Sequence, residues 1–184
     1  MKTSLYAVLA KALSCTEIEQ KLTLTAELAS DWAAGQLDSQ NTDPVELCCG
    51  RPEKPELVSP RDVPYRKPNT PEGRARLLHA IVHIEFSAIN LALDHAARFP
   101  GMPRQYYADW IGVAAEEAYH FRILRERLQA LGHDYGDFPA HAGLWEMAEK
   151  TAGDVLARMA LVPRLLEARG LDATPPFQRK LEQV

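Results

Sequence analysis

Apolar residues recur every three or four positions over most of this chain, and no stretch alternates as a half-buried strand does. This periodicity predicts amphipathic helices joined by short loops, so the expected fold class is all-α, a helical bundle of long antiparallel helices. The predicted helices cover residues 4–13, 16–34, 71–98, 103–131 and 140–169.

The N-terminal pair of helices carries local signals of its own. Thr16 and Glu19 have the spacing of a capping box, and Gly35 follows the second helix as a terminator. Apolar residues four apart give that helix one hydrophobic face, which needs a partner in the main body or in another protomer. These residues are Leu24, Leu28 and Trp32.

Composition divides the chain into three predicted regions. Six of the thirteen prolines fall within residues 36–70, a density that neither a helix nor a central strand tolerates. We expect an extended, Pro-rich strap laid over the body, with a loose linker as the alternative. The domains are then an N-terminal helical hairpin over 1–35, the strap over 36–70 and a bundle of long helices over 71–184.

The boundaries of the long helices are marked by capping residues. Thr70 has the position of an N-cap before Pro71 at the first helical position. Gly132 and Gly170 are expected to end the second and third long helices. Pro163 should kink the third.

Polar residues interrupt the apolar faces at two points. Glu85 lies within the stripe of the first long helix, where a carboxylate must be paired or bound to a cation. Metal ligation is one interpretation, and a surface pair with Arg74 or Arg76 is the other. On the second long helix Glu117 and His120 lie three apart on one face and can reach one cation, although a single such pair also arises by chance.

Three further residues are weaker candidates. Glu167 follows a mostly apolar line on the third helix, and it is either a ligand or a solvated residue of the last turn. His79 and His83 lie four apart and could bind a metal or support its ligands, but the face they define is not that of Glu85, which disfavours both roles. No catalytic residue is assigned.

Charge and cysteine content exclude some classes of protein. With 21 basic and 25 acidic residues among 184, the net charge of −4 argues against generic nucleic-acid binding. Three cysteines, two of them adjacent, predict no disulfide framework. Lys11 interrupts the short apolar start, which disfavours a signal peptide, and no stretch reaches membrane-span length. We therefore expect a cytoplasmic protein that does not associate with membranes.

Residues 50–174 resemble a bacterial ferritin-like family of unknown function, domain-of-unknown-function family four-five-five. The matching phrases include RPEKPELVSPRDVP, TPEGRARLLHAIVHIEFSAINLALD and FPGMPRQYYADWIGVAAEEAYHF. Two more are LGHDYGDFPAHAGLWEMAEKTAGD and LARMALVPRLLEARGLDATP. The family is similar in fold to a di-iron tRNA hydroxylase and to the ubiquinone-synthesis hydroxylases.

The resemblance implies that residues 71–184 form a ferritin-like bundle that lacks a fourth core helix, and that this bundle holds a di-iron centre. In it Glu85 would ligate one iron, Glu117 would bridge, His120 would complete the first iron and Glu167 would serve the second. Manganese suits the same ligands. The family pattern includes a fourth core helix with a second Glu-x-x-His, and this sequence reaches Val184 without one. The chain is therefore expected to be truncated, to lack that helix or to have its site completed by another chain.

Three functions remain open at this point. The first is a non-haem di-iron oxidoreductase that activates dioxygen and acts on a small molecule or a modified base. The second is an iron-binding protein without an organic substrate, and the third is a metal-free helical interaction module. Apolar faces left without a partner also predict a homo-oligomer.

Overall fold

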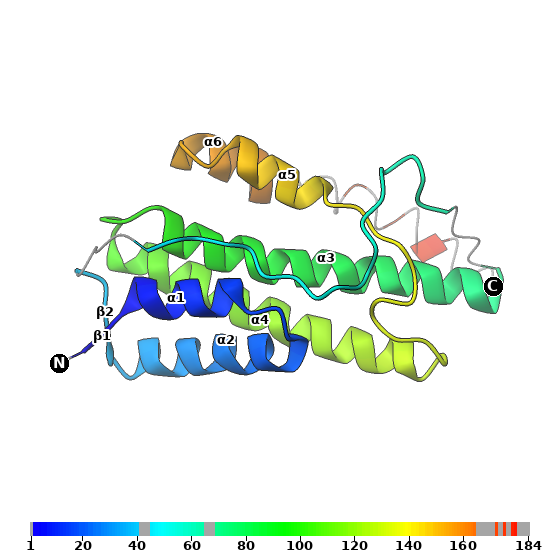
Figure 1. Cartoon of the computed structure of the whole chain (residues 1–184), viewed down its shortest axis with the longest axis horizontal. Helices are drawn as coiled ribbons and strands as arrows, with labels where there is room; N and C mark the ends of the chain where they lie inside the picture. The colour runs from blue at the N-terminus through cyan, green and yellow to red at the C-terminus, as the bar shows by residue number, and fades with distance from the viewer. Residues whose placement is uncertain are drawn as a thin grey trace. The chain divides into compact units, whose positions relative to one another are not determined.

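The computed structural model describes residues 2–40, 45–64 and 69–164, together with positions 172, 175, 178 and 179. It is mostly helical, which confirms the expected all-α class (Figure 1). The only strands among the described residues are a two-residue parallel pair, with Thr3 opposite Leu37. The elements are β1 Thr3–Ser4, α1 Leu5–Ser14, α2 Ile18–Ala33, β2 Leu37–Asp38, α3 Pro71–Arg98, α4 Arg104–Gln129, α5 Gly143–Lys150, α6 Val155–Met159 and the π-helical turn η1 Ala160–Arg164.

The start of α3 is the one that the sequence predicts. Pro71 is its first residue, and the Thr70 hydroxyl accepts a hydrogen bond from the Gly73 N–H at 3.0 Å. That bond satisfies one of the four backbone donors that a helix leaves open at its N-terminus. At the other boundaries Gly35 and Gly132 have φ of 67° and 81°, the left-handed conformation expected of terminating glycines.

Contacts divide the chain into two compact units. One comprises Met1–Lys54 and Ile84–Ile123, and the other comprises Pro55–His83 and Leu124–Val184. Both α3 and α4 contribute a segment to each unit.

In the first unit α1 and α2 pack with residues 84–98 of α3 and 104–123 of α4 (Figure 1). Trp32 of α2 and Tyr6 of α1 both contact the ring of Tyr107 on α4. The apolar face of α2 is therefore covered within its own chain rather than by another protomer. The side chains at the centre are at most 2% exposed: Leu5, Leu9, Leu28, Phe86, Ile89, Leu93, Ile111 and Phe121.

The direction of the helices gives this unit its connectivity. α1 and α2 are antiparallel, as are α3 and α4, whereas α2 and α3 run in the same direction (Figure 1). Lys21 at the start of α2 donates to Asn90 of α3. Trp32 near the end of α2 contacts the ring of Tyr107, whose hydroxyl donates to the carbonyl of Phe99 just after the end of α3. The chain between α2 and α3 is consequently a long crossover rather than a tight turn.

In the second unit, residues 56–58 pair with the loop that precedes α5. The Val58 N–H donates to the Ala140 carbonyl at 2.8 Å, and the Ala140 N–H donates to the Glu56 carbonyl at 2.9 Å. Leu57 and Val58 are half-buried there. This part of the predicted strap is thus held by backbone hydrogen bonds, as an extended segment requires when it lies on a protein surface.

The third long helix, predicted over 140–169, is wrong as a single element. Its described part is broken into α5, α6 and η1 by a turn at residues 151–154. Asp154 caps α6, because its carboxylate accepts from the N–H groups of Leu156 and Ala157. The buried Arg158 donates to Thr151 at 2.8 Å and to the carbonyl of Ala148 near the end of α5. Helical periodicity continues across the turn, so the pattern alone does not reveal the break.

The capping box predicted for the second helix is also wrong. α2 begins at Ile18, its N-cap is Glu17, and no side chain caps it. The turn after α1 places Thr16 one residue too early for its hydroxyl to reach the first free N–H groups. Pro163 lies inside η1, where its missing N–H removes a helical hydrogen bond.

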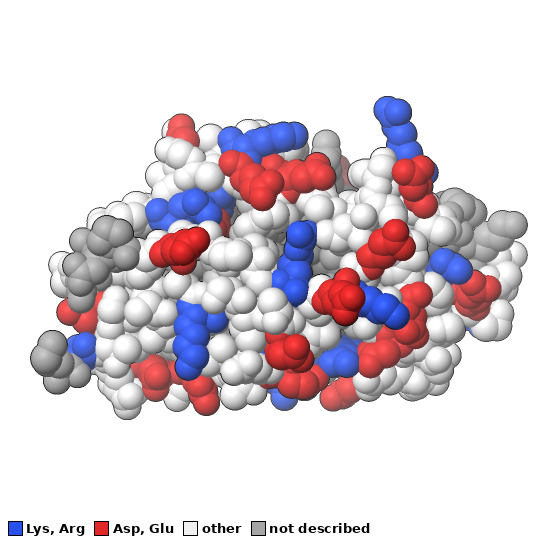
Figure 2. Space-filling model, viewed as in Figure 1, with Lys and Arg blue, Asp and Glu red and all other residues white. Residues whose placement is uncertain are grey.

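We expected no stretch long and apolar enough to span a membrane, and one helix departs from that expectation. α3 is long and apolar enough by length and composition, with a window of mean hydropathy 1.3 that is 50% buried. Core helices of soluble proteins pass the same test, so this is weak evidence for a span. On the face drawn in Figure 2 acidic and basic side chains are interspersed, without a broad field of one sign.

Candidate metal centre

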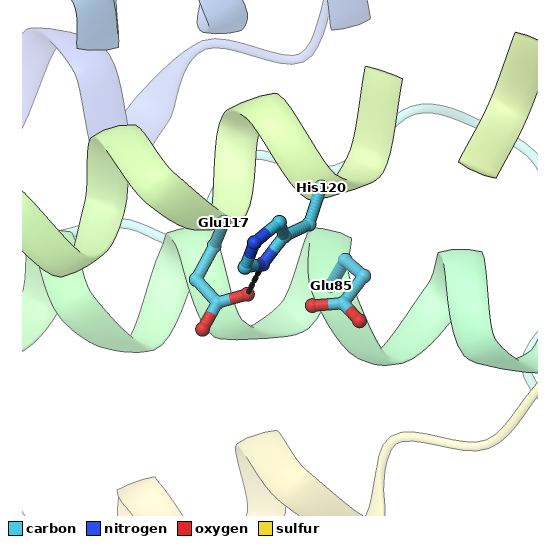
Figure 3. A group of neighbouring side chains, drawn as sticks. All are labelled: Glu85, Glu117 and His120. Carbon is cyan, nitrogen blue, oxygen red and sulfur yellow. Dashed lines mark hydrogen bonds and ion pairs between the residues drawn. The ribbon is translucent and has the colours of Figure 1, made fainter. Parts of the chain in front are cut away.

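Glu85 projects from α3 at the edge of the buried stripe. Val82, Phe86, Ile89 and Leu93 are among the buried residues of this helix, and Glu85 is half-buried beside them. Its side chain points toward Glu117 and His120 of α4 (Figure 3). The two helices also meet in the core, where Phe86 packs on Phe121 with ring centroids 5.6 Å apart.

Glu117 and His120 project together from α4. Their side chains are one helical turn apart, and the His120 Nδ1 lies 3.3 Å from a Glu117 carboxylate oxygen. Glu117 has 20% of its side chain exposed and His120 has 48%. The neighbouring Ala118 and Phe121 are buried and anchor this turn of the helix to the core.

The three side chains converge (Figure 3). One donor atom from each of Glu85, Glu117 and His120 lies within 4.8 Å of the other two. Nitrogen and oxygen ligands lie about 2.0–2.2 Å from a metal such as zinc, so two ligands of one ion are at most about 4.4 Å apart. Small side-chain rotations therefore suffice for all three to bind one ion, and the donor set fits a metal.

The chemistry of the donors narrows the class of metal. Two carboxylates with one imidazole form a mixed hard and borderline set without a soft thiolate, which suits iron, manganese or zinc better than copper(I). The exposure of His120 leaves room for a water or another ligand on that side. This is the only group of at least three potential ligands found among the described residues.

The other predicted candidates have different positions. Glu167 lies outside the described residues. His79 and His83 belong to the second unit, where both rings stack on Tyr135. The backbone N–H of Gly136 donates to His79 Nε2 at 3.0 Å.

His83 bridges the same loop. Its Nε2 lies 3.1 Å from the carbonyl oxygen of His141, and its Nδ1 lies 2.9 Å from the Tyr135 hydroxyl. Because a carbonyl only accepts, a neutral His83 donates from Nε2 and accepts the Tyr135 proton at Nδ1. Both histidines therefore act as structural partners of the loop after α4.

The sequence analysis missed a buried polar group in the first unit. Lys21 is fully buried, and its ammonium donates to the carbonyls of Ala12 and Leu13 at 3.0 and 2.7 Å and to Asn90 Oδ1 at 2.8 Å. It thus caps the C-terminus of α1, where the helix dipole also favours a cation. A signal existed, since Lys21 has helical spacing to the apolar Leu24 and Leu28.

Burial also shifts ionisation near this lysine. Burial lowers the pKa of Lys21 to about 8, and the charges of Cys49 and Cys15 raise this pKa by a smaller amount. Burial raises the pKa of the Cys49 thiol to about 11. Both shifts follow from the cost of holding a charge away from water.

Comparison with known proteins gives the family. A family model described as "Protein of unknown function (DUF455)" matches residues 14–184. The chain belongs to this family. An uncharacterized protein of Haemophilus influenzae (strain ATCC 51907 / DSM 11121 / KW20 / Rd) is 58% identical over 147 residues, which are 76% of this chain and 51% of that protein. The chain thus spans about half the length of that DUF455 relative, and no solved structure matches.

Proposed function

We propose that Glu85, Glu117 and His120 bind iron and that this DUF455 chain is a ferritin-like, non-haem di-iron oxidoreductase that uses dioxygen on an organic substrate. The observation that carries the proposal is the convergence of three donor atoms from two antiparallel helices within 4.8 Å. Two carboxylates held close together and partly away from water repel each other, and a bound cation would offset that cost.

The arrangement of the first unit supports the same proposal. Ferritin-like bundles contain one long crossover connection, and their di-iron sites take a Glu from each of two helices and a Glu-x-x-His from each of the other two. Here α3 supplies a Glu and α4 supplies a Glu-x-x-His. A second iron would need further ligands, and Glu167, which lies outside the described residues, is the candidate within this chain.

Each residue has a distinct part in this proposal. Glu85 and Glu117 would bind the metal through carboxylate oxygens and offset its charge, and His120 would supply an imidazole nitrogen as the third ligand. Bound iron would supply the redox chemistry and the activation of dioxygen. The buried turn of α4 around Ala118 and Phe121 would keep Glu117 and His120 in place before a metal binds.

The decisive experiment is metal analysis of the purified chain after anaerobic loading with ferrous iron. We expect iron in the native chain and a loss of at least tenfold in affinity, about 1.4 kcal/mol, in Glu117→Ala. Glu116→Ala is the matched control, because Glu116 is its exposed neighbour on the same helix and lies outside the cluster. Bound iron should also raise the melting temperature of the native chain and of the control, but not of Glu117→Ala.

The stoichiometry then separates the possibilities. Two irons per chain support a complete di-iron site, and one iron supports a site built from Glu85, Glu117 and His120 alone. An absence of iron in every variant contradicts the proposal and favours the metal-free interaction module. Where iron binds, dioxygen consumption without an organic product would favour an iron-handling protein instead.

The compartment and the partners are part of the same proposal. Cys15, Cys48 and Cys49 are free thiols, which fits the reducing cytoplasm. The substrate is proposed to be a small molecule or a modified base rather than bulk nucleic acid, in keeping with the net charge of −4.

A further inference from the structure

Five of the chain's nine tyrosine and tryptophan rings form one connected set in the first unit. Trp110 and Tyr106 have ring centroids 6.4 Å apart, Tyr106 and Tyr107 are 5.6 Å apart, and Tyr107 and Trp32 are 6.1 Å apart. Tyr6 joins the set at Tyr107, with 2.7 Å between the two hydroxyl oxygens. A core built only for packing needs no such concentration of polar aromatic rings, whose hydroxyls must all find partners.

One end of this set lies close to the candidate metal centre. Trp110 precedes Glu117 by seven residues on α4, which is two helical turns or roughly 10 Å along the axis. Seven residues also bring the two side chains to nearly the same face of the helix. The Trp110 indole is stacked on the fully buried imidazole of His95, with centroids 3.9 Å apart and planes 14° apart.

The other end of the set lies one side chain from solvent. Trp32 is 6% exposed, and the guanidinium of Arg104 covers its ring at 4.3 Å from the centroid. Arg104 is exposed at the start of α4. An electron reaching or leaving Trp32 therefore crosses only the thickness of one side chain to a reagent in solution.

Indoles are better suited than the phenols here to carry a charge. An oxidised tyrosine must release its proton to a base, and the phenols of this set bond to weak bases. Tyr106 donates to the His95 carbonyl at 2.9 Å, and Tyr107 donates to the Phe99 carbonyl at 3.2 Å. Tyr106 and Tyr107 consequently provide electronic coupling between the two tryptophans and do not themselves become radicals.

We propose that Trp110 and Trp32, bridged by Tyr106 and Tyr107, form an electron-transfer path between the candidate metal centre and the surface. The inference rests on the proposed function. Trp110 gives one electron to the oxidised centre, which is thereby reduced by one electron, and Trp32 replaces that electron. A one-electron reductant of the thiol or ascorbate class then re-reduces Trp32, and both indoles keep their N–H protons throughout. Such a path protects a dioxygen-using site when no substrate is present.

The test uses metal-free protein, so that it does not depend on iron binding. A ruthenium photosensitiser is coordinated to His120, the one histidine in the described chain that is classed as exposed. Flash oxidation of the label in the native chain should produce an indole radical detectable by transient absorption and electron paramagnetic resonance. Peptide mapping should then find Trp32 oxidised.

Conservative variants identify the path. Trp110→Phe keeps an aromatic ring against His95 and should lower the oxidation of Trp32 to the level of unlabelled protein. Trp145→Phe is the matched control, because Trp145 lies on α5 in the second unit, and it should leave the oxidation of Trp32 unchanged. Circular dichroism spectra that match those of the native chain establish that both variants fold.

The outcomes separate this inference from the proposed function. Oxidation of Trp32 that is equal in Trp110→Phe and the native chain, or absent from both, overturns the path even if iron binds. Oxidation that depends on Trp110 establishes the path from His120 to Trp32 even if metal analysis finds no iron, and in that case only the proposed function fails.

Discussion

Lys21 shows how one residue connects several elements of the first unit. Its ammonium bonds two carbonyls at the end of α1 and the side chain of Asn90 on α3, all away from solvent. A buried cation with fewer acceptors would strongly destabilise the fold. Here three acceptors satisfy the buried ammonium, and desolvation still lowers its pKa to about 8.

This shift predicts a pH dependence of stability. Between about pH 8 and the unfolded pKa of 10.5, the unfolded chain binds more protons at Lys21 than the folded chain does, so stability rises with pH. The raised pKa of Cys49 acts in the opposite sense from about pH 9, so pH 8 to 9 is the clean window.

In that window the free energy of unfolding of the native chain should rise by about 1 kcal/mol relative to Lys21→Met. Urea denaturation at pH 8 and pH 9 measures this difference. Lys11→Met, at an exposed lysine of α1, is the control and should follow the native chain. Parallel pH dependences for the native chain and Lys21→Met would show that Lys21 is charged in the folded state throughout the window.

At the scale of elements, the turn between α1 and α2 holds the chain that follows β2. The Gly50 N–H donates to the Leu13 carbonyl at 2.9 Å, so residue 50 lies directly against the end of α1. A Cβ at Gly50 would overlap the carbonyl oxygens of Ser14 and Cys15. Glycine is required here for close approach of two backbones rather than for a positive φ.

Two alanine substitutions should therefore have opposite effects. Gly50→Ala should lower the free energy of unfolding by about 1–3 kcal/mol, the usual cost of overpacking. Gly112→Ala, inside α4 with open space around the position, should raise it by about 0.5–1 kcal/mol through helix propensity. Denaturant titrations followed by circular dichroism measure both. Equal stability of Gly50→Ala and the native chain would mean that the two backbones can move apart with no loss in the free energy of unfolding.

At the scale of the whole molecule, large apolar side chains remain exposed in the described chain. Leu156 is 76% exposed, Tyr119 is 56% exposed and Ile84 is 50% exposed. Such groups mark surfaces that other protein covers when they lie together. Self-association therefore stays a prediction for this protein.

Light scattering coupled to size exclusion tests it. We expect a mass above the 20.5 kDa of one chain, and a shift toward that value when Leu156 and Tyr119 are both replaced by Ser. Glu116→Ala, at an exposed polar position of α4, should leave the mass unchanged. A monodisperse monomer of the native chain would contradict the prediction.

Local features of the chain were predictable from its sequence. Thr70 and Pro71 mark the start of α3 because capping depends on neighbouring residues alone. Glu85, Glu117 and His120 were identifiable because a polar residue in an apolar stripe must face the same neighbour as the stripe. The structure then brings these three together within 4.8 Å, which periodicity on separate helices can suggest but not measure.

Contacts between distant segments required the tertiary structure. Helical periodicity predicts that the apolar face of α2 is covered. Only the packing of the chain shows that α1, α3 and α4 cover it rather than another protomer. The break between α5 and α6 depends on Arg158 bonding back to Ala148 and Thr151, a choice made in three dimensions. The burial of Lys21 likewise depends on carbonyls and an amide from two other helices, because a charge enters a core only where distant groups converge to satisfy it.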